Sequence, residues 1–173
     1  MKIVHVIPAL TKGGGERVAV ELANFAADSG NQVTILAAFP VAPSLLQHLI
    51  HPQIEIKFVS KNGRASYLQM LWWIARNLQW LSSFDILHCH LTYGAFFASL
   101  TRILRRIRFI KKPCIVETYH AVGMPISSLH RKIHSQLARQ RDALVLMAKD
   151  EYWQQFILNN KNLLTRIIPN GIN

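Results

Sequence analysis

The sequence contains few cysteines and no apolar run long enough to cross a bilayer. Its two cysteines, Cys89 and Cys114, lie far apart inside apolar segments, which argues against a disulfide scaffold, a zinc finger or a paired redox motif. No apolar run approaches the roughly 18 residues of a membrane span, and residues 1–6 resemble a strand rather than a signal peptide. We therefore expect a cytoplasmic protein whose cysteines are buried free thiols.

Acidic residues are also scarce. Nine Asp and Glu accompany twenty Lys and Arg in 173 residues, which gives a formal net charge of +11. Such an excess favours an anionic partner, either nucleic acid, an anionic membrane or a phosphate-bearing small molecule. Nucleic acid is the least favoured of these, because the arginines gather on one amphipathic helix instead of lying among exposed aromatic residues. Since half of the residues are hydrophobic, the chain can form one well-cored domain.

Strand and helix patterns alternate along the whole chain. Apolar, β-branched runs predict strands at residues 2–7, 32–39, 54–59, 85–91, 113–118, 142–147 and 166–168. Apolar residues at helical spacing predict helices at 16–30, 65–81, 93–107, 129–141 and 149–158. This alternation predicts an α/β fold of the Rossmann-like, doubly wound kind, with a parallel sheet in a domain of residues 1–168. Residues 169–173 form a turn sequence that we expect to begin an interdomain linker.

A glycine run opens the first predicted helix. At Gly13–Gly15 the absence of β-carbons lets backbone amides approach a phosphate, and the helix dipole favours its negative charge. The run is not a P-loop, because Glu16 and Arg17 follow it where Lys and Ser or Thr are needed. It is not a dinucleotide fingerprint either, because Val18 stands where a small residue is required. The alternative is that the glycines only form a tight strand-to-helix turn.

Histidines end two of the central strands. His88 and His90 share one face of the fourth strand, and His120 follows the fifth, where an imidazole can donate to a phosphate or a sugar oxygen. A metal would need a third ligand, for which His120 is the nearest candidate, and the plainer alternative is hydrogen bonding to loop backbone. Glu117 has two interpretations, an internal counter-ion or a catalytic group.

The predicted helix 93–107 is basic and amphipathic. Apolar residues form a stripe, and the other positions carry Arg102, Arg105, Arg106 and Arg108. Such a helix is typical of proteins that bind an anionic membrane surface. The alternative is a solvated outer face on a helix whose apolar side is already buried.

Six short segments in order identify a family resemblance. They are Gly13–Glu16, Leu22–Ala23, Gly30–Leu36, Asp85–His90, Thr118–His120 and Ile168–Asn173. Together they resemble the N-terminal domain of family 4 glycosyltransferases, over almost the whole chain. The resemblance implies one half of a two-domain GT-B enzyme that transfers a sugar with retention of configuration, without a metal or another cofactor.

The resemblance also implies roles for particular residues. Gly13, Gly14 and Gly15 match the loop that faces the donor diphosphate, and His120 matches the histidine near the transferred sugar, so we expect it to be catalytic. We expect Lys12, His90 and Tyr119 to contact the acceptor.

The function that follows is the acceptor-binding half of a glycosyltransferase. It would transfer a sugar from a nucleotide-sugar donor to a cell-surface glycan or a lipid-linked acceptor such as a lipopolysaccharide precursor. We expect the C-terminal donor domain to be absent from the chain and the chain alone to be inactive. We also expect peripheral attachment to the inner face of the cytoplasmic membrane. The competing interpretation is a non-catalytic basic module that binds anionic membranes or phosphorylated ligands.

Overall fold

Seven parallel strands form a single sheet. The computed structural model describes residues 1–41, 46–61, 63, 66–120 and 127–169. The strands are β1 (Lys2–Ile7), β2 (Gln32–Ala37), β3 (Glu55–Phe58), β4 (Ile86–His90), β5 (Cys114–Tyr119), β6 (Ala143–Leu146) and β7 (Leu164–Ile167). Their order in space is β3-β2-β1-β4-β5-β6-β7, which confirms the doubly wound prediction. The winding direction reverses between β1 and β4, where open α/β sheets bind ligands beyond the carboxyl ends of their strands.

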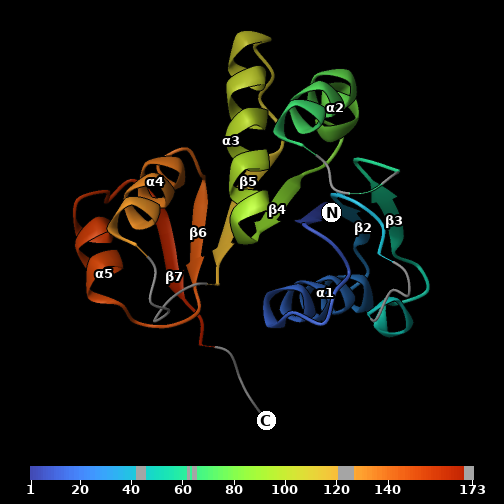
Figure 1. Ribbon diagram of the computed structural model, residues 1–173, viewed down its shortest axis with the longest axis horizontal. Helices are drawn as coiled ribbons and strands as arrows, with labels where there is room; N and C mark the ends of the chain where they lie inside the picture. Colours follow the sequence, from blue (N-terminus) through green and yellow to red (C-terminus); the bar gives the residue numbers. More distant parts are fainter. Residues whose placement is uncertain (42–45, 62, 64–65, 121–126, 170–173) are drawn as a thin grey trace.

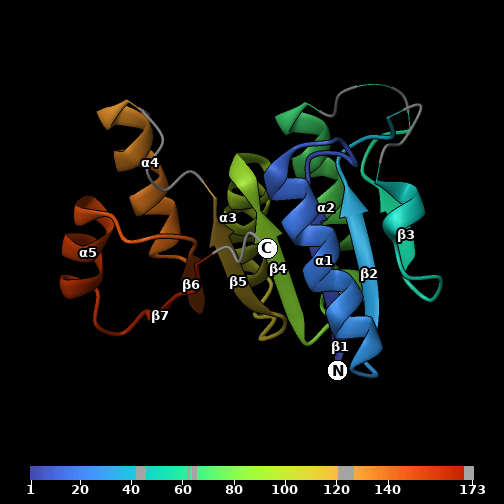
Figure 2. The ribbon, with the colours of Figure 1, turned by 90° about the horizontal axis from the view of Figure 1, so that it is seen from below.

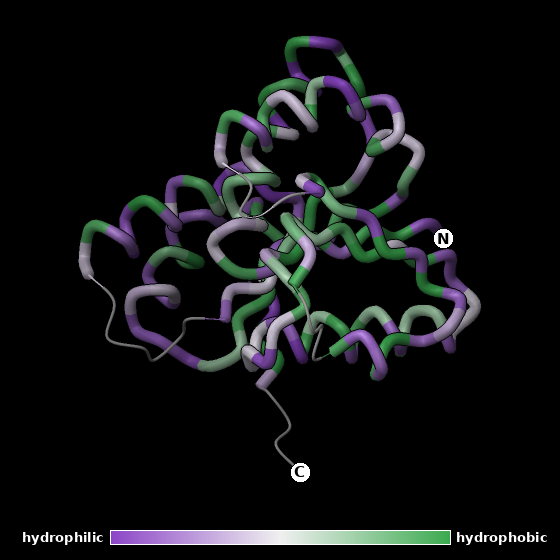
Figure 3. Tube along the Cα trace, turned by 45° about the vertical axis from the view of Figure 1, so that its right-hand side comes forward, coloured by the Kyte–Doolittle hydropathy of each residue, from purple (hydrophilic) through white to green (hydrophobic). Residues whose placement is uncertain are grey.

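The helices lie on both faces of this sheet. They are α1 (Gly14–Asp28), a 3-10 turn η1 (Gln47–Leu49), α2 (Tyr67–Leu81), α3 (Leu91–Ile107), α4 (Ser128–Ala138) and α5 (Glu151–Leu158). Helix α1 lies on one face, and α2 to α5 lie on the other (Figure 1). The strands are mainly apolar, whereas the helices alternate apolar and polar segments (Figure 3). This is the pattern of helices that bury one side against a sheet.

The sheet separates two main hydrophobic cores. On the side of α2 and α3, Val6, Leu87, Cys89 and Phe97 are fully buried members of one cluster. On the side of α1, the buried residues come mainly from β1, β2 and α1; examples are Ile7, Val20, Ala23 and Ile35. Helix α1 covers mainly β1 and β2 (Figure 2). Within the described residues no helix covers β5 to β7 on this side.

The turn between β4 and α3 is sharper than the sequence suggested. The prediction extended the strand to Leu91 and began the helix at Tyr93, but β4 ends at His90 and α3 starts at once. Leu91 makes the turn with a φ of 60°, a left-handed conformation that bulky residues rarely adopt. A β-carbon at Gly94 would lie 3.1 Å from the carbonyl carbon of Cys89, so glycine permits this close approach.

Other boundaries differ by a few residues from the predictions. Strand β2 ends at Ala37 instead of residue 39, and β7 begins at Leu164 instead of residue 166. The thiols also differ, because Cys89 is buried but Cys114 is exposed. Cys114 is exposed because it occupies the first position of β5. Its apolar neighbours in the sequence do not indicate whether this end of the strand is covered.

Candidate functional site

Three segments that are distant in the sequence meet at the carboxyl edge of the sheet. A β-carbon at Gly15 would lie 2.6 Å from Cδ2 of Leu91 and 3.4 Å from Cγ of His120. The glycine loop after β1, the turn after β4 and the end of β5 are therefore neighbours. They lie at the topological switch point, where such sheets bind ligands.

The N-terminus of α1 presents open backbone at this edge. Gly13 occupies the N-cap position in an extended conformation with no side-chain cap. Glu16 folds back over Gly13 and accepts a hydrogen bond from Thr11 Oγ1 at 3.2 Å. Gly14 is exposed, and a β-carbon there would meet no atom within 4 Å. The exposed backbone at Gly14 leaves room for an anion at this helix end, which the helix dipole favours, but the Glu16 carboxylate beside Gly13 would repel it.

A cluster of four histidines lies next to the glycine loop. His5 Nδ1 is 3.1 Å from His90 Nε2, and His90 Nδ1 is 3.3 Å from His120 Nε2. His88 Nε2 is 2.8 Å from the hydroxyl of Thr118. The register pairs His5 with His88 and His90 with Thr118, so the cluster lies on the α1 side of β1, β4 and β5.

Burial keeps these imidazoles neutral near pH 7. Desolvation lowers the pKa of His120 to about 4, although the charge of Glu117 partly opposes the shift. Desolvation, with the repulsion of His120, also lowers the pKa of His88 to about 4. The pKa values of His5 and His90 are well below the usual range, again mainly because of burial. Each ring therefore offers one donor and one acceptor instead of a positive charge.

The sequence did not single out His5, yet it is central to the cluster. Its side chain is only 2% exposed and its Nε2 has no hydrogen-bond partner within the described part of the chain. The one available signal was a polar residue in the middle of an otherwise apolar strand, because such a position must find partners across the sheet.

Three of the histidines lie close enough together in space to resemble the ligands of a metal ion. Nitrogens of His5, His88 and His90 lie within 4.8 Å of one another, and imidazole suits zinc, copper, iron and nickel. The group differs from the one considered from the sequence, which used His120 as third ligand. Since these rings already hydrogen-bond to one another and to Thr118, they are satisfied in part without an ion.

Two of the expected acceptor contacts are misplaced. Tyr119 lies on the opposite face of the sheet, 3% exposed, with its ring 4.7 Å from that of Trp153. His90 is fully buried, and its Nδ1 is hydrogen-bonded to His120, which lies at the edge. Lys12 is exposed on the glycine loop and stays a predicted acceptor contact. Both corrections have one cause: strand alternation shows which residues share a face, but not what covers that face.

Glu117 is a buried counter-ion on the far face of the sheet. Arg141 Nε donates to its Oε2 at 2.6 Å, and the same guanidinium donates to the Ala95 carbonyl and the Ser99 hydroxyl. Burial opposes the charge of Glu117, but Arg141 and His134 hold the pKa of the carboxyl below its usual value. Of the two interpretations left open above, the structure supports the structural one.

Only part of the predicted arginine surface on α3 faces solvent. Arg105 is buried, and its guanidinium donates to backbone carbonyls of residues 110, 111 and 113. Arg102 pairs with Asp142 at 2.6 Å. Arg106 and Arg108 are exposed. The expectation for Arg105 was wrong, because the chain after α3 folds back and needs a donor for its carbonyls.

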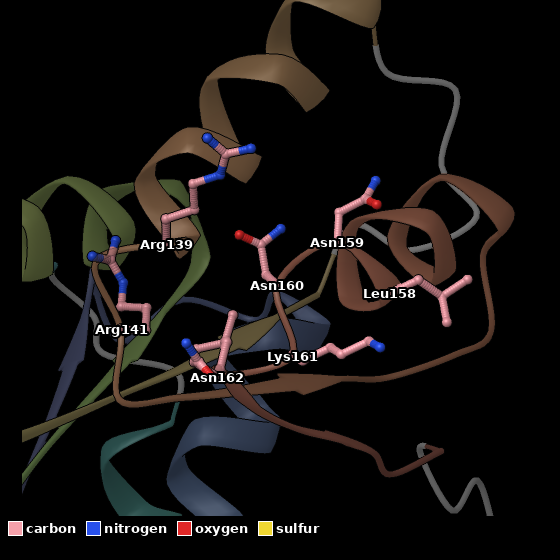
Figure 4. A pocket seen from close by; sticks show the side chains of 8 residues that line it. Arg139, Arg141, Leu158, Asn159, Asn160, Lys161 and Asn162 are labelled. Carbon is pink, nitrogen blue, oxygen red and sulfur yellow. The ribbon is translucent and has the colours of Figure 1, made fainter.

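Among the residues that the structure describes, two of the hollows lie outside the histidine cluster. One of about 620 Å³ is lined by Arg139, Arg141 and residues 158–163 (Figure 4). It lies where α4 and α5 end, and helix C-termini carry partial negative charge that favours cations already present there. The other, of about 380 Å³, lies beyond β2 and β3 and is mostly apolar, with Leu10, Val41 and Phe58 among its lining residues. Leu10 links this second hollow to the glycine loop.

The chain is similar to known glycosyltransferases in sequence and in fold. The Glycosyltransferase Family 4 domain matches residues 12–173. HepE from Anabaena, solved in complex with UDP and glucose, has 18% identity and a TM-score of 0.69, with 100% of this chain and 45% of that chain covered. MurG from Acinetobacter baumannii has 16% identity and a TM-score of 0.55, with 100% and 46% covered.

A third solved structure shows the same partial coverage. Sucrose-phosphate synthase from Thermosynechococcus elongatus has 13% identity and a TM-score of 0.57, with 99% of this chain and 48% of that chain covered. The chain thus spans about half the length of these structures and matches one half of the GT-B fold. No curated protein matches it.

Proposed function

The chain belongs to glycosyltransferase family 4, and from this membership we propose that it forms the acceptor-side half of a sugar-transferring enzyme. The donor would be a nucleotide sugar, and the acceptor a cell-surface glycan or a lipid-linked precursor. The observation that carries the proposal is the contact of the glycine loop with Leu91 and His120. The N-terminus of α1 and the neutral imidazole of His120 therefore lie together, and this arrangement supports binding of a donor diphosphate and its sugar.

Each part of this edge has a task in the proposal. The open amides at Gly14 approach the diphosphate, whose negative charge grows as the sugar departs. His120 reaches the transferred sugar or the departing phosphate as a hydrogen-bond partner, because its low pKa keeps it uncharged. The apolar hollow beside Leu10 suits an acceptor with an apolar portion.

Nucleotide binding to the intact chain tests this proposal. With UDP-glucose as the probe, the amides of Gly14 and Gly15 should shift in proton–nitrogen correlation spectra, with a Kd no tighter than about 1 mM. Gly14→Val should weaken this binding about tenfold or more, because a branched side chain blocks close backbone approach. The space around Gly14 is empty, so the variant should keep its fold.

Uridine, which lacks the diphosphate, is the matched ligand control and should leave both amides unmoved. Equal affinity of the parent chain and Gly14→Val for UDP-glucose would contradict the role of the loop.

We also propose that the outer surface of α2 and α3 attaches the protein to an anionic membrane. No helix among the described residues combines the length and the apolarity needed to cross a bilayer. Large apolar side chains are nevertheless exposed here, with Leu68 at 78%, Trp72 at 61% and Phe109 at 93%. Between Ile56 and Val116 the sequence has a single acid, Asp85, so this surface is basic as well as apolar.

A further inference from the structure

The histidine cluster contains a chain of three imidazoles that leads from the core to the site edge. His5 on β1 contacts His90 at the end of β4, and His90 contacts His120 after β5, with nitrogen separations of 3.1 and 3.3 Å. His5 is 2% exposed and His90 is fully buried. His120 is partly exposed at the glycine loop. The row of three imidazoles therefore has a buried inner end at His5 and an outer end at His120 that faces the site.

The two hydrogen bonds in this chain must point the same way. A neutral imidazole carries one N–H and one bare nitrogen, so His90 donates at one nitrogen and accepts at the other. Either every ring has its proton on Nδ1 and the bonds run from His5 outward, or every ring has it on Nε2 and the bonds run inward. The two arrangements give His120 opposite properties at its remaining nitrogen, Nδ1.

The inner end decides between these arrangements. His5 Nε2 is buried without a partner in the described part of the chain. With outward bonds this nitrogen is a bare acceptor, whereas with inward bonds it is an orphaned N–H donor. Orphaned buried N–H groups are the rarer kind in proteins, so the outward direction has the lower free energy. His120 then has its proton on Nδ1.

The surroundings of the chain keep it uncharged. His88 faces both inner rings, at centroid distances of 5.0 Å from His5 and 4.2 Å from His90, and Thr118 holds His88 in turn. The acid whose charge raises the pKa of His120 is Glu117, and its carboxylate is already paired with Arg141. A proton placed on any of the three rings would thus meet burial and repulsion, without a free carboxylate to stabilise it.

We propose that His90 and His5 are positioning residues that hold His120 as a neutral imidazole with its proton on Nδ1. His120 then donates a hydrogen bond into the site through Nδ1 and does not act as a base there. This nitrogen has no hydrogen-bond partner among the described residues, which leaves it available to an oxygen of the sugar or the phosphate. That last use rests on the function proposed above, but the tautomer does not.

Nitrogen NMR of the histidine side chains tests the proposal on the intact chain without any ligand. In protein labelled with nitrogen-15 at histidine, two-bond correlations distinguish a protonated ring nitrogen from a bare one. We expect His120 and His90 to be protonated on Nδ1 at pH 7, by about tenfold over the other tautomer, because the other arrangement leaves a buried N–H donor of His5 unpaired. Protonation of His120 on Nε2 would overturn the proposal.

Two variants at one position separate positioning from packing. His90→Phe removes both hydrogen bonds, and His120 should revert to the Nε2–H form that free imidazole side chains prefer. His90→Asn places an amide donor near the former Nδ1 and should keep His120 protonated on Nδ1. His88→Phe, a similar change two residues earlier on the same strand, should leave His120 unchanged.

Three results would contradict the proposal that His90 and His5 set the tautomer of His120. An unchanged His120 in His90→Phe would show that His90 does not set its tautomer. If His90→Phe does not fold, loss of the Nδ1–H form in His90→Asn would contradict the proposal instead. If added Zn²⁺ shifts the nitrogen resonances of His5, His88 and His90 together, the cluster is a metal centre and the proposal is wrong. If the tautomers are as expected but UDP-glucose fails to bind, the proposed function is wrong, whereas the proposed tautomer of His120 is confirmed.

Discussion

Single residues in this protein take their roles from the face of the sheet on which they lie. Glu117 and Thr118 are adjacent in β5, yet Glu117 faces α3 and α4 while Thr118 faces the histidine cluster. The buried Glu117 forms its ion pair with Arg141, which also joins the turn between α4 and β6 to α3 through the Ala95 carbonyl. Such a pair is costly to break, because the remaining charge stays buried without compensation.

Removing the charge of Glu117 should therefore destabilise the fold. We expect Glu117→Gln to lower the free energy of unfolding by about 3–5 kcal/mol, since Arg141 would keep a buried positive charge. Urea denaturation followed by circular dichroism measures this loss. Glu21→Gln breaks an exposed pair with Arg17 and should change stability little. Equal, small losses in both variants would show that Glu117 is not a structural counter-ion.

At the scale of elements, α2 and α3 lie on the face of the sheet opposite α1 (Figure 1). They pack side by side, and Tyr67 at the start of α2 contacts Phe96 near the start of α3 with ring centroids 5.1 Å apart. Further along, Arg108 Nη1 lies 3.5 Å from the Ala75 carbonyl, so the turn after α3 lies against the middle of α2. The exposed apolar and basic residues of both helices thus belong to one layer.

If α2 and α3 attach the protein to a membrane, removing an exposed apolar side chain from them should reduce binding to vesicles. Phe109→Ser should reduce the fraction that floats with anionic vesicles about tenfold, because burying one such side chain in the acyl boundary contributes about 1.5–3 kcal/mol. Trp72→Ser should act in the same direction. The assay is flotation with vesicles that contain or lack phosphatidylglycerol.

Phe25 supplies the matched control for this experiment. It is 72% exposed but lies on α1, on the other side of the sheet, so Phe25→Ser should float like the parent. If the parent chain floats equally poorly with both kinds of vesicle, the attachment proposal is wrong.

At the scale of the whole molecule, the four histidines that join β1, β4 and β5 make stability depend on pH. His88 and His120 have pKa values of about 4 when folded, against about 6.5 in an unfolded chain. The unfolded state therefore binds more protons between these values. Their contribution to stability is complete above pH 6.5 and is lost as the pH falls toward 4.

Acid should accordingly weaken the fold before most carboxylates titrate. We expect the urea midpoint to fall steadily from pH 6.5 to 4.5, with up to about four protons taken up on unfolding, one for each histidine of the cluster. His88→Gln should reduce that slope, whereas His48→Gln, at an exposed position on η1, should leave it unchanged. A flat profile over this range in the parent chain would mean that the cluster does not resist protonation.

The sequence by itself determined the α/β class, the order of its elements and the position of the glycine loop. These features are local: β-branched runs predict strands, helical spacing predicts helices, and the glycines mark the first strand-to-helix turn. The strand Lys2–Ile7 was predicted to the residue. The family resemblance arose from similarly local motifs, and the match over residues 12–173 confirms it.

Only the tertiary structure decided which of the predicted site residues meet. Alternation along a strand pairs His88 with His90 on one face, but the inter-strand register that brings His5 to them depends on hydrogen bonds between segments about 85 residues apart. Likewise, Tyr119 and Arg105 resemble surface groups until a neighbouring helix or a returning chain covers them. Burial is a property of the assembled layers, and so the electrostatics of the histidine cluster could not be predicted before the sheet was assembled.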